Sequence, residues 1–250
     1  MKKIISSILL ANMALFAFSS SSVSVLTGNF DGNSAIYDTE DGGLKSTVTF
    51  ETFSVNKVGD VFGFIDYTVA EDKMLYSDDT KTTFYGEYMP RLSLSYVTGN
   101  DLSVSIFKDF YLAGQVNAGS DADFQAGLIG LGTSLNLPGF DFFTLNAYYK
   151  HAKLTIGKEY SRDTFQISPS YRLYIGSTGI SFAGWMDYTG YSYQTQNQLL
   201  YDAYKIDGAG TIKVGFEHLY YYEIKDFTGQ TINGDRPVSN TLQVMMQYKW

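Results

Sequence analysis

Several features are scarce in this chain of 250 residues, which has no cysteine, four prolines and two histidines. Without cysteine the fold cannot depend on disulfides, although this absence says little about the cellular compartment. Basic residues are also in the minority, with 18 Lys and Arg against 26 Asp and Glu. Nucleic-acid binders normally carry a basic patch, so this balance argues against nucleic acid as a partner.

The sequence also lacks a long apolar run of the kind that crosses a membrane as a helix. The apolar run over residues 4–18 is short of the ~20 residues that a spanning helix needs. It follows Lys2 and Lys3 and precedes four serines, which is the order of charged, apolar and small residues in a secretory signal peptide. We therefore predict a signal peptide over residues 1–20, cleaved near 19–21, and a single exported domain over residues 22–250.

Aromatic residues and glycine are abundant, with 21 Tyr, 18 Phe and 24 Gly. This composition favours strands joined by tight turns. The clearest strand lies at the C-terminus, where Leu242, Val244, Met246, Tyr248 and Trp250 alternate with mostly polar residues. A period of two predicts one apolar and one polar face. A chain that ends on outward-pointing aromatic residues is typical of a strand whose apolar face meets lipid.

Similar alternation along the chain predicts twelve strands. Most connections after even-numbered strands are short and those after odd-numbered strands are long, as in outer-membrane barrels. The exception begins at Pro90, which we expect to end its strand because proline lacks a backbone donor. We interpret residues 91–102 as an irregular connection, either a structured insert or a miscounted hairpin. The expected strands cover residues 23–30, 47–55, 60–70, 81–89, 107–116, 123–135, 141–153, 162–175, 179–189, 197–205, 211–225 and 240–250.

Two fold classes share this alternation, a soluble sandwich of two sheets and a closed barrel. In hydrocarbon each unpaired backbone group costs several kcal/mol, so a strand protein there must close its sheet. The signal peptide, the aromatic C-terminus and the unequal connections together favour an all-β transmembrane antiparallel up-and-down barrel in the outer membrane of a Gram-negative-type cell. We expect a monomer that contacts outer-membrane lipid and meets the outer-membrane assembly machinery through its aromatic last strand.

The polar faces of the strands would line the inside of this barrel. They carry carboxylates, a few basic groups and many aromatic rings. A structural lumen of paired charges would use the same groups, but stacking on an aromatic ring is worth ~1–3 kcal/mol per base. A nucleoside could stack its base on such a ring, and a neighbouring carboxylate could accept hydrogen bonds from its sugar hydroxyls. The candidates for solute contact are Phe62, Phe64, Asp66, Glu87, Asp109, Tyr111, Tyr148, Arg172, Trp185 and Asp187.

Several motifs also carry a family resemblance. The run EYMPRLS over residues 87–93, TGNDLS over 98–103 and FKD over 107–109 resembles a pattern of the Tsx/OmpK family of nucleoside-specific channels, with Met89 where that pattern has an acid. GFID over 63–66 and GWMD over 184–187 resemble other parts of it. The resemblance covers nearly the whole mature chain and is strongest over residues 87–149. It implies a twelve-stranded monomeric outer-membrane barrel that passes nucleosides by diffusion through aromatic and ionisable lumenal sites.

Two other functions stay open at this point. An enzyme would need a base beside a serine, typically histidine, whereas His151 and His218 fall on the expected lipid face. We therefore expect no enzyme. A general small porin, or a structural or receptor barrel with a blocked lumen, could present residues 31–44 or 225–239 to phage or another surface ligand. We expect no cofactor and no metal site, and we interpret Asp121 and Asp123 as solvated loop charges.

Overall fold

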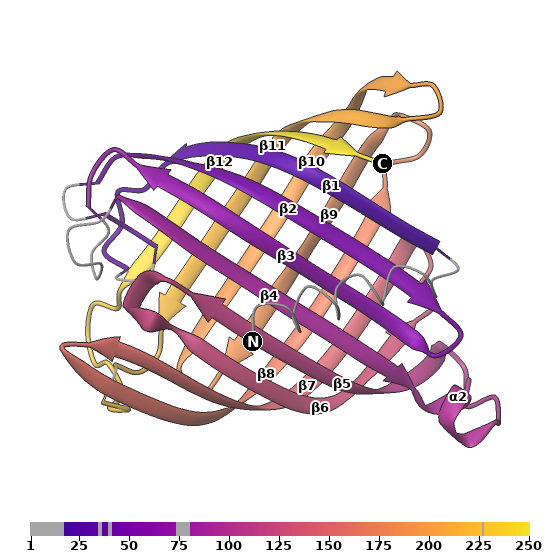
Figure 1. Ribbon diagram of the computed structural model, residues 1–250, viewed down its shortest axis with the longest axis horizontal. Helices are drawn as coiled ribbons and strands as arrows, with labels where there is room; N and C mark the ends of the chain where they lie inside the picture. Colours follow the sequence, from indigo (N-terminus) through magenta and orange to yellow (C-terminus); the bar gives the residue numbers. More distant parts are fainter. Residues whose placement is uncertain (1–17, 35–36, 40–41, 74–80, 227) are drawn as a thin grey trace, which may run out of the picture.

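The computed structural model describes residues 18–34, 37–39, 42–73, 81–226 and 228–250. These residues form a closed antiparallel barrel of twelve strands, in which β1 closes on β12 (Figure 1). The predicted fold class and strand number are confirmed. The strands are β1 (Phe18–Asn29), β2 (Leu44–Asn56), β3 (Gly59–Ala70), β4 (Thr82–Ser93), β5 (Phe107–Gly119), β6 (Gln125–Leu135), β7 (Phe140–Ile156), β8 (Lys158–Tyr174), β9 (Ile180–Thr189), β10 (Ser192–Ile206), β11 (Gly210–Glu223) and β12 (Val238–Lys249).

The two faces of the wall differ in the way a membrane barrel requires. On the outer face, Ile129 and Leu131 of β6 are 60% and 63% exposed. On the inner face, Gln166 of β8 and Gln243 of β12 are buried. A soluble sandwich would bury its apolar faces and solvate its polar ones, so this inverted arrangement identifies the outer face as the lipid-facing one. Among the described residues, no helix has the length and apolar character needed to cross a membrane.

Aromatic residues mark both rims of the outer face. Tyr248 stacks on Trp250 at one rim, with ring centroids 5.3 Å apart. Tyr193 stacks on Tyr222 at the opposite rim at 5.4 Å, and Tyr220 packs against both. Aromatic belts of this kind lie at the headgroup level of membrane proteins.

The two ends of the barrel carry different connections. At one end of the barrel lie the start of β1, the end of β12 and the helix α2 (Leu94–Thr98), and we call it the turn end (Figure 1). It has short turns after β2, β6, β8 and β10. The loop end has the long connections 30–43, 71–81 and 224–237. The expectation that all connections after odd-numbered strands are long is wrong for β7–β8 and β9–β10. β7, β8 and β10 are longer than predicted, β7 and β8 with 17 residues each, and only short turns remain in these two connections.

Pro90 does not end its strand, which corrects the sequence prediction. β4 continues to Ser93, and Val61 of β3 is paired with Pro90. On the other side, the pairing of β4 with β5 is interrupted between Tyr88 and Arg91. Proline has no backbone N–H to donate, and at Pro90 that donor would have pointed toward β5, where the pairing is interrupted. Proline is tolerated in a sheet at such positions.

The connection after β4 is a structured insert, and the strand count needs no extra hairpin. Residues 91–93 belong to β4, and α2 follows directly. The Oγ of Ser93 accepts a hydrogen bond from the Tyr96 N–H, and Gly99 ends the helix in the left-handed region at φ 68°. A side-chain cap at the start and a left-handed glycine at the end are the usual boundaries of a helix. They explain why this segment does not continue as a strand.

The first strand begins at Phe18, upstream of the predicted start at Val23. Ser21 and Trp250 exchange two backbone hydrogen bonds of 2.9 Å, so Ser21 belongs to the seam that closes the barrel. The predicted signal peptide falls largely on residues 1–17, which lie outside the described residues, and it stays a prediction. Because Ser21 takes part in this seam, we expect the intact mass of the purified protein to match a chain that starts no later than Ser21, at least one residue before the domain start predicted from the sequence. A later start would remove the last pair of the seam and contradict this prediction.

Candidate functional site

The middle of the lumen contains a carboxylate held by three donors. Glu87 of β4 accepts hydrogen bonds from the Tyr85 hydroxyl at 2.5 Å and from the side-chain amides of Gln115 and Asn117 at 2.9 Å each. Both carboxylate oxygens are used as acceptors. All three neighbours donate, so they fix the position of the Glu87 carboxylate on the inner wall.

Other charged groups face Glu87 from different strands. Asp66 of β3, Asp187 of β9 and Lys150 of β7 lie within electrostatic range of Glu87. Asp187 accepts a hydrogen bond of 2.5 Å from Ser168, and Lys150 donates one of 2.7 Å to a Gln166 oxygen. Three carboxylates and one ammonium group thus meet at one level of the lumen, which leaves an acidic balance there.

Further carboxylates extend the acidic surface around the wall. Glu51 accepts from Ser22 at 2.9 Å, and Glu217 accepts from Gln198 at 2.8 Å and from Gln243 at 3.1 Å. Hydrogen-bond donors rather than basic side chains hold these carboxylates. Within the described chain, no group of three or more His, Cys, Asp or Glu side chains could hold a metal ion.

Aromatic rings lie beside these carboxylates on the inner face. Phe62 and Phe64 of β3 have ring centroids 6.2 Å apart, and Phe64 lies 5.9 Å from Tyr85. Tyr148 of β7 is 4% exposed and lies within electrostatic range of Glu87 and Asp187. Trp185 of β9 shares the inner face through its register partners on β8 and β10. The lumen therefore offers both ring faces and carboxylates at the same level.

The candidates Asp109, Tyr111 and Arg172 also lie on the inner face, but at the turn end. Asp109 accepts hydrogen bonds from Ser93 and Ser95 and so anchors the start of α2. The Tyr111 ring lies 4.3 Å below the guanidinium of Arg91. Arg172 is already paired with Asp141 at 2.6 Å. The structure thus groups Phe62, Phe64, Asp66, Glu87, Tyr148, Trp185 and Asp187 nearer the middle and leaves the other three candidates near the turn end.

Ion pairs are a common feature of the turn end. Asp60 and Arg91 form a bidentate pair with distances of 2.8 and 2.7 Å. Lys213 lies 2.5 Å from Asp202 between β11 and β10. These pairs balance positive and negative charge at this end, in contrast to the acidic middle of the lumen.

Sequence reasoning missed one element of the lumen. The stretch that it assigned to an outer loop, residues 31–44, carries Tyr37, whose ring lies 5.1 Å from that of Tyr221 of the inner wall. The Lys45 ammonium, also on the inner face, donates to the Tyr37 carbonyl at 2.5 Å. The loop shows no periodic pattern, so only an aromatic residue in an otherwise acidic and glycine-rich stretch could have suggested this contact.

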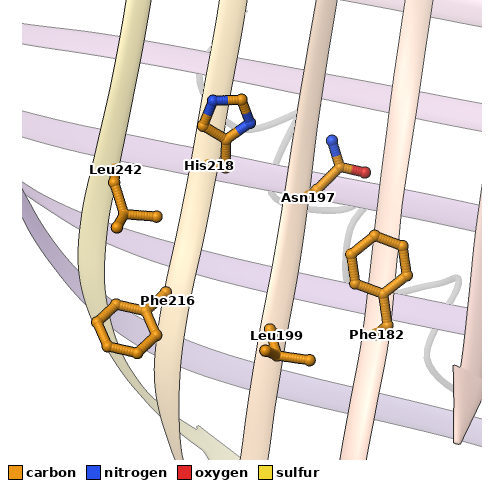
Figure 2. Close-up of a pocket in the computed structure, with 6 residues that line it drawn as sticks. All are labelled: Phe182, Asn197, Leu199, Phe216, His218 and Leu242. Carbon is orange, nitrogen blue, oxygen red and sulfur yellow. The ribbon is translucent and has the colours of Figure 1, made fainter.

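One hollow lies on the outer wall and not in the lumen. Figure 2 shows its side chains on neighbouring strands of the wall. It has a volume of about 460 Å³, and all its lining residues come from outward-facing positions. A solute crossing the membrane would not meet this surface. The lining residues are Phe182 of β9, Asn197 and Leu199 of β10, Phe216 and His218 of β11, and Leu242 of β12.

A polar cluster on the outer wall near the loop end also escaped the sequence reasoning. His151 Nδ1 lies 2.8 Å from Asp163 Oδ1, and His151 Nε2 lies 3.5 Å from Ser161 Oγ. The order of groups is that of a hydrolase triad. However, the side chains of His151 and Asp163 are 44% and 61% exposed, and Tyr149 also donates to Asp163. Catalysis of this type needs a water-excluded site with oxyanion donors, so we interpret the cluster as a hydrogen-bonded group at the headgroup level.

Comparison with known proteins gives matches in sequence and in structure. Residues 33–241 match the family model described as nucleoside-specific channel-forming protein, Tsx. Outer membrane protein OmpK of Vibrio parahaemolyticus is 28% identical over 153 residues, which are 59% of this chain and 56% of that protein. The chain thus spans about half the length of the curated relative that it matches.

The similar solved structures are outer-membrane barrels with low sequence identity. A structure of the KdgM porin has a TM-score of 0.43 and 10% identity, and the match covers 91% of this chain and 98% of that one. OccAB4 of Acinetobacter baumannii has a TM-score of 0.31 and 9% identity, with coverage of 94% and 98%. The family model, by contrast, matches most of the chain over residues 33–241. The chain therefore belongs to the Tsx family of nucleoside-specific channel-forming proteins, and it is an outer-membrane β-barrel.

Proposed function

We propose that this barrel is a channel for the passive diffusion of nucleosides, or of similar small polar solutes, across the outer membrane. The observation that carries the proposal is the meeting of Phe64, Asp66, Glu87, Tyr148 and Asp187 at one level of a single lumen. These residues come from four strands, so a solute in the lumen would touch several of them at once. Diffusion through such a lumen needs no energy source and no cofactor, and one barrel suffices, so we propose a monomer.

The chemistry of this level matches the two parts of a nucleoside. An aromatic ring offers a stacking face for the base, and a carboxylate accepts hydrogen bonds from ribose hydroxyls. In the part of the chain that the structure describes, the buried Tyr148 hydroxyl and one oxygen each of Asn146 and Asn117 have no hydrogen-bond partner. Buried polar atoms normally have one, so these atoms are suited to bind a polar solute. The carboxylates would repel phosphate, which favours nucleosides over nucleotides.

A barrel with a blocked lumen is the second candidate, because several inward side chains are tightly packed. Gln166 of β8 is fully buried and Met245 of β12 is 2% exposed. Conductance in a planar lipid bilayer separates the two candidates. A channel passes a steady ion current, whereas a structural or receptor barrel with a blocked lumen passes none.

The nucleoside proposal predicts a loss of binding in the variant with Phe64→Ala and Asp66→Ala. We expect adenosine and uridine to block the single-channel current of the wild-type protein and to block that of the variant about tenfold more weakly. The variant removes one stacking ring and one acceptor, and one ring alone is worth ~1–3 kcal/mol. The measurement is a titration of current block in a planar bilayer.

Tyr67→Ala is the matched control for this variant. Tyr67 lies on the same strand, but its ring packs against Phe84 on the outer face. Its removal should leave the nucleoside block unchanged. Equal block in wild type and in the Phe64 and Asp66 variant would remove these two residues from the site, and no block in the wild type would refute nucleosides as the solute.

A further inference from the structure

Several described residues of the connection between β1 and β2 pack against the barrel wall. Phe30 and Thr39 are 3% and 2% exposed, and Ser34 and Asp38 are fully buried. A surface loop normally stays exposed because its backbone groups need water. The burial of these four residues shows that this part of the connection packs against the barrel wall.

Hydrogen bonds to β12 hold this connection in place. The Asp38 carboxylate accepts from the Ser34 N–H at 2.8 Å and from the Ser239 hydroxyl at 3.0 Å. The Asn33 side-chain oxygen accepts from the Val238 N–H at 2.8 Å, and the Asn33 N–H donates to the Val238 carbonyl at 3.2 Å. Ser239 lies on the inner face of β12, so the anchor of the loop is inside the wall.

These anchors fix Tyr37 among the groups of the lumen. Its carbonyl accepts from Lys45 of β2, and its ring lies 5.1 Å from that of Tyr221 of β11, tilted by 54°. Burial raises the pKa of the Tyr37 hydroxyl well above its usual value, and the negative charges of Glu87, Asp187 and Asp66 raise it further. On the wall, Gln194 of β10 is the register partner of both Tyr221 and Asp187, so the Tyr37 ring lies beside a row of inward side chains that leads to Asp187.

We propose that Tyr37 is a specificity-determining residue of the channel, which places a ring in the solute path beside Tyr221 and near the row of inward side chains that leads to Asp187. The inference deepens the proposed function and rests on it, because it assigns a contact to the same solute. The residues named in the proposed function lie on strands of the wall, whereas Tyr37 lies in the connection between β1 and β2. Because the anchors hold the Tyr37 ring beside Tyr221, the ring would contact the base of a passing solute and so set which bases pass.

The test compares Tyr37→Ala, Tyr37→Phe and wild type in planar bilayers. We expect Tyr37→Ala to raise the single-channel conductance, because a large side chain leaves the ion path, and to weaken nucleoside block about fivefold or more, because one stacking face is lost. Tyr37→Phe keeps the ring and should keep both the conductance and most of the block. Tyr193→Ala is the control, because Tyr193 stacks on Tyr222 on the outer wall.

Failure of this inference can be told apart from failure of the proposed function. A wild type that conducts ions but shows no nucleoside block refutes the nucleoside proposal, and the inference about specificity falls with it. A wild type that is blocked, with the same conductance and block in Tyr37→Ala, refutes the inference alone. If Tyr37→Ala does not fold, Ser239→Ala carries the test, because it removes one anchor of the loop. It should then weaken nucleoside block, because the Tyr37 ring is no longer held beside Tyr221, and a block equal to that of the wild type would overturn the inference.

Discussion

Arg91→Met is expected to lower the free energy of unfolding by about 3–5 kcal/mol, because it leaves the buried carboxylate of Asp60 without its partner. The two side chains are each 9% exposed and form a bidentate pair. The Arg91 guanidinium also lies 4.3 Å from the centre of the Tyr111 ring, so the substitution removes a cation–π contact as well. The substitution thus removes contacts of β4 with both β3 and β5 at the turn end.

The pair of Arg172 and Asp141 gives a matched control at the same end of the barrel. It has a similar distance of 2.6 Å, but its side chains are 28% and 39% exposed. Exposed ion pairs contribute ~0–1 kcal/mol, so Arg172→Met should change the unfolding free energy little. The measurement is urea unfolding in lipid vesicles, followed by the fluorescence of Trp185 and Trp250. Equal losses in the two variants would contradict the role of burial.

A second variant distinguishes the loss of the ion pair from the cost of leaving the Asp60 carboxylate buried without a partner. Asp60→Asn together with Arg91→Met removes both charges at once. Because most of the cost of Arg91→Met comes from an uncompensated buried carboxylate, the double variant should recover a large part of the stability. A double variant as unstable as Arg91→Met would mean that packing against Tyr111, and not the charge of Asp60, is the main loss.

The period-two pattern was sufficient for the fold because side chains alternate strictly along a strand. It assigned Leu242 and Val244 to the outer face and Gln243 to the inner face, as the structure has them. It failed at Pro90, where the outcome depends on which neighbouring strand would need the missing donor. That information lies in the pairing of β4 with β3 and β5 and not in the local sequence.

The candidate site was predictable by face but not by depth. The pattern placed Asp66 and Asp109 on inner faces alike, yet Asp66 lies near Glu87 while Asp109 holds α2 at the turn end. Depth follows from strand tilt and from the partners on neighbouring strands, which single-strand patterns do not contain. Tyr37 was missed for a related reason, because its contact with Tyr221 joins two segments that are far apart in the sequence.

The acidic middle of the lumen leads to a second large effect, on ion selectivity. Glu87, Asp187 and Asp66 face one another with Lys150 as the basic group beside them. A narrow, low-dielectric passage lined by one sign of charge concentrates counter-ions by ~10–10³-fold. We therefore expect the wild-type channel to prefer cations, as measured by the reversal potential in a salt gradient across a planar bilayer.

Replacing the central carboxylates should remove most of this preference. For the variant with Glu87→Gln and Asp187→Asn we expect the cation-to-anion permeability ratio to fall about tenfold, because two of the charges that set the local potential are lost while Lys150 stays. Asp163→Asn is the matched control, since it makes the same change of acid to amide on the outer wall, beside His151. Glu87 accepts hydrogen bonds from Gln115 and Asn117, so its replacement could disturb the fold. Resistance of the barrel to SDS at room temperature checks that the variant is folded. An unchanged permeability ratio in a folded variant would mean that ions do not pass the level of Glu87 and Asp187, and the solute path would then have to lie elsewhere.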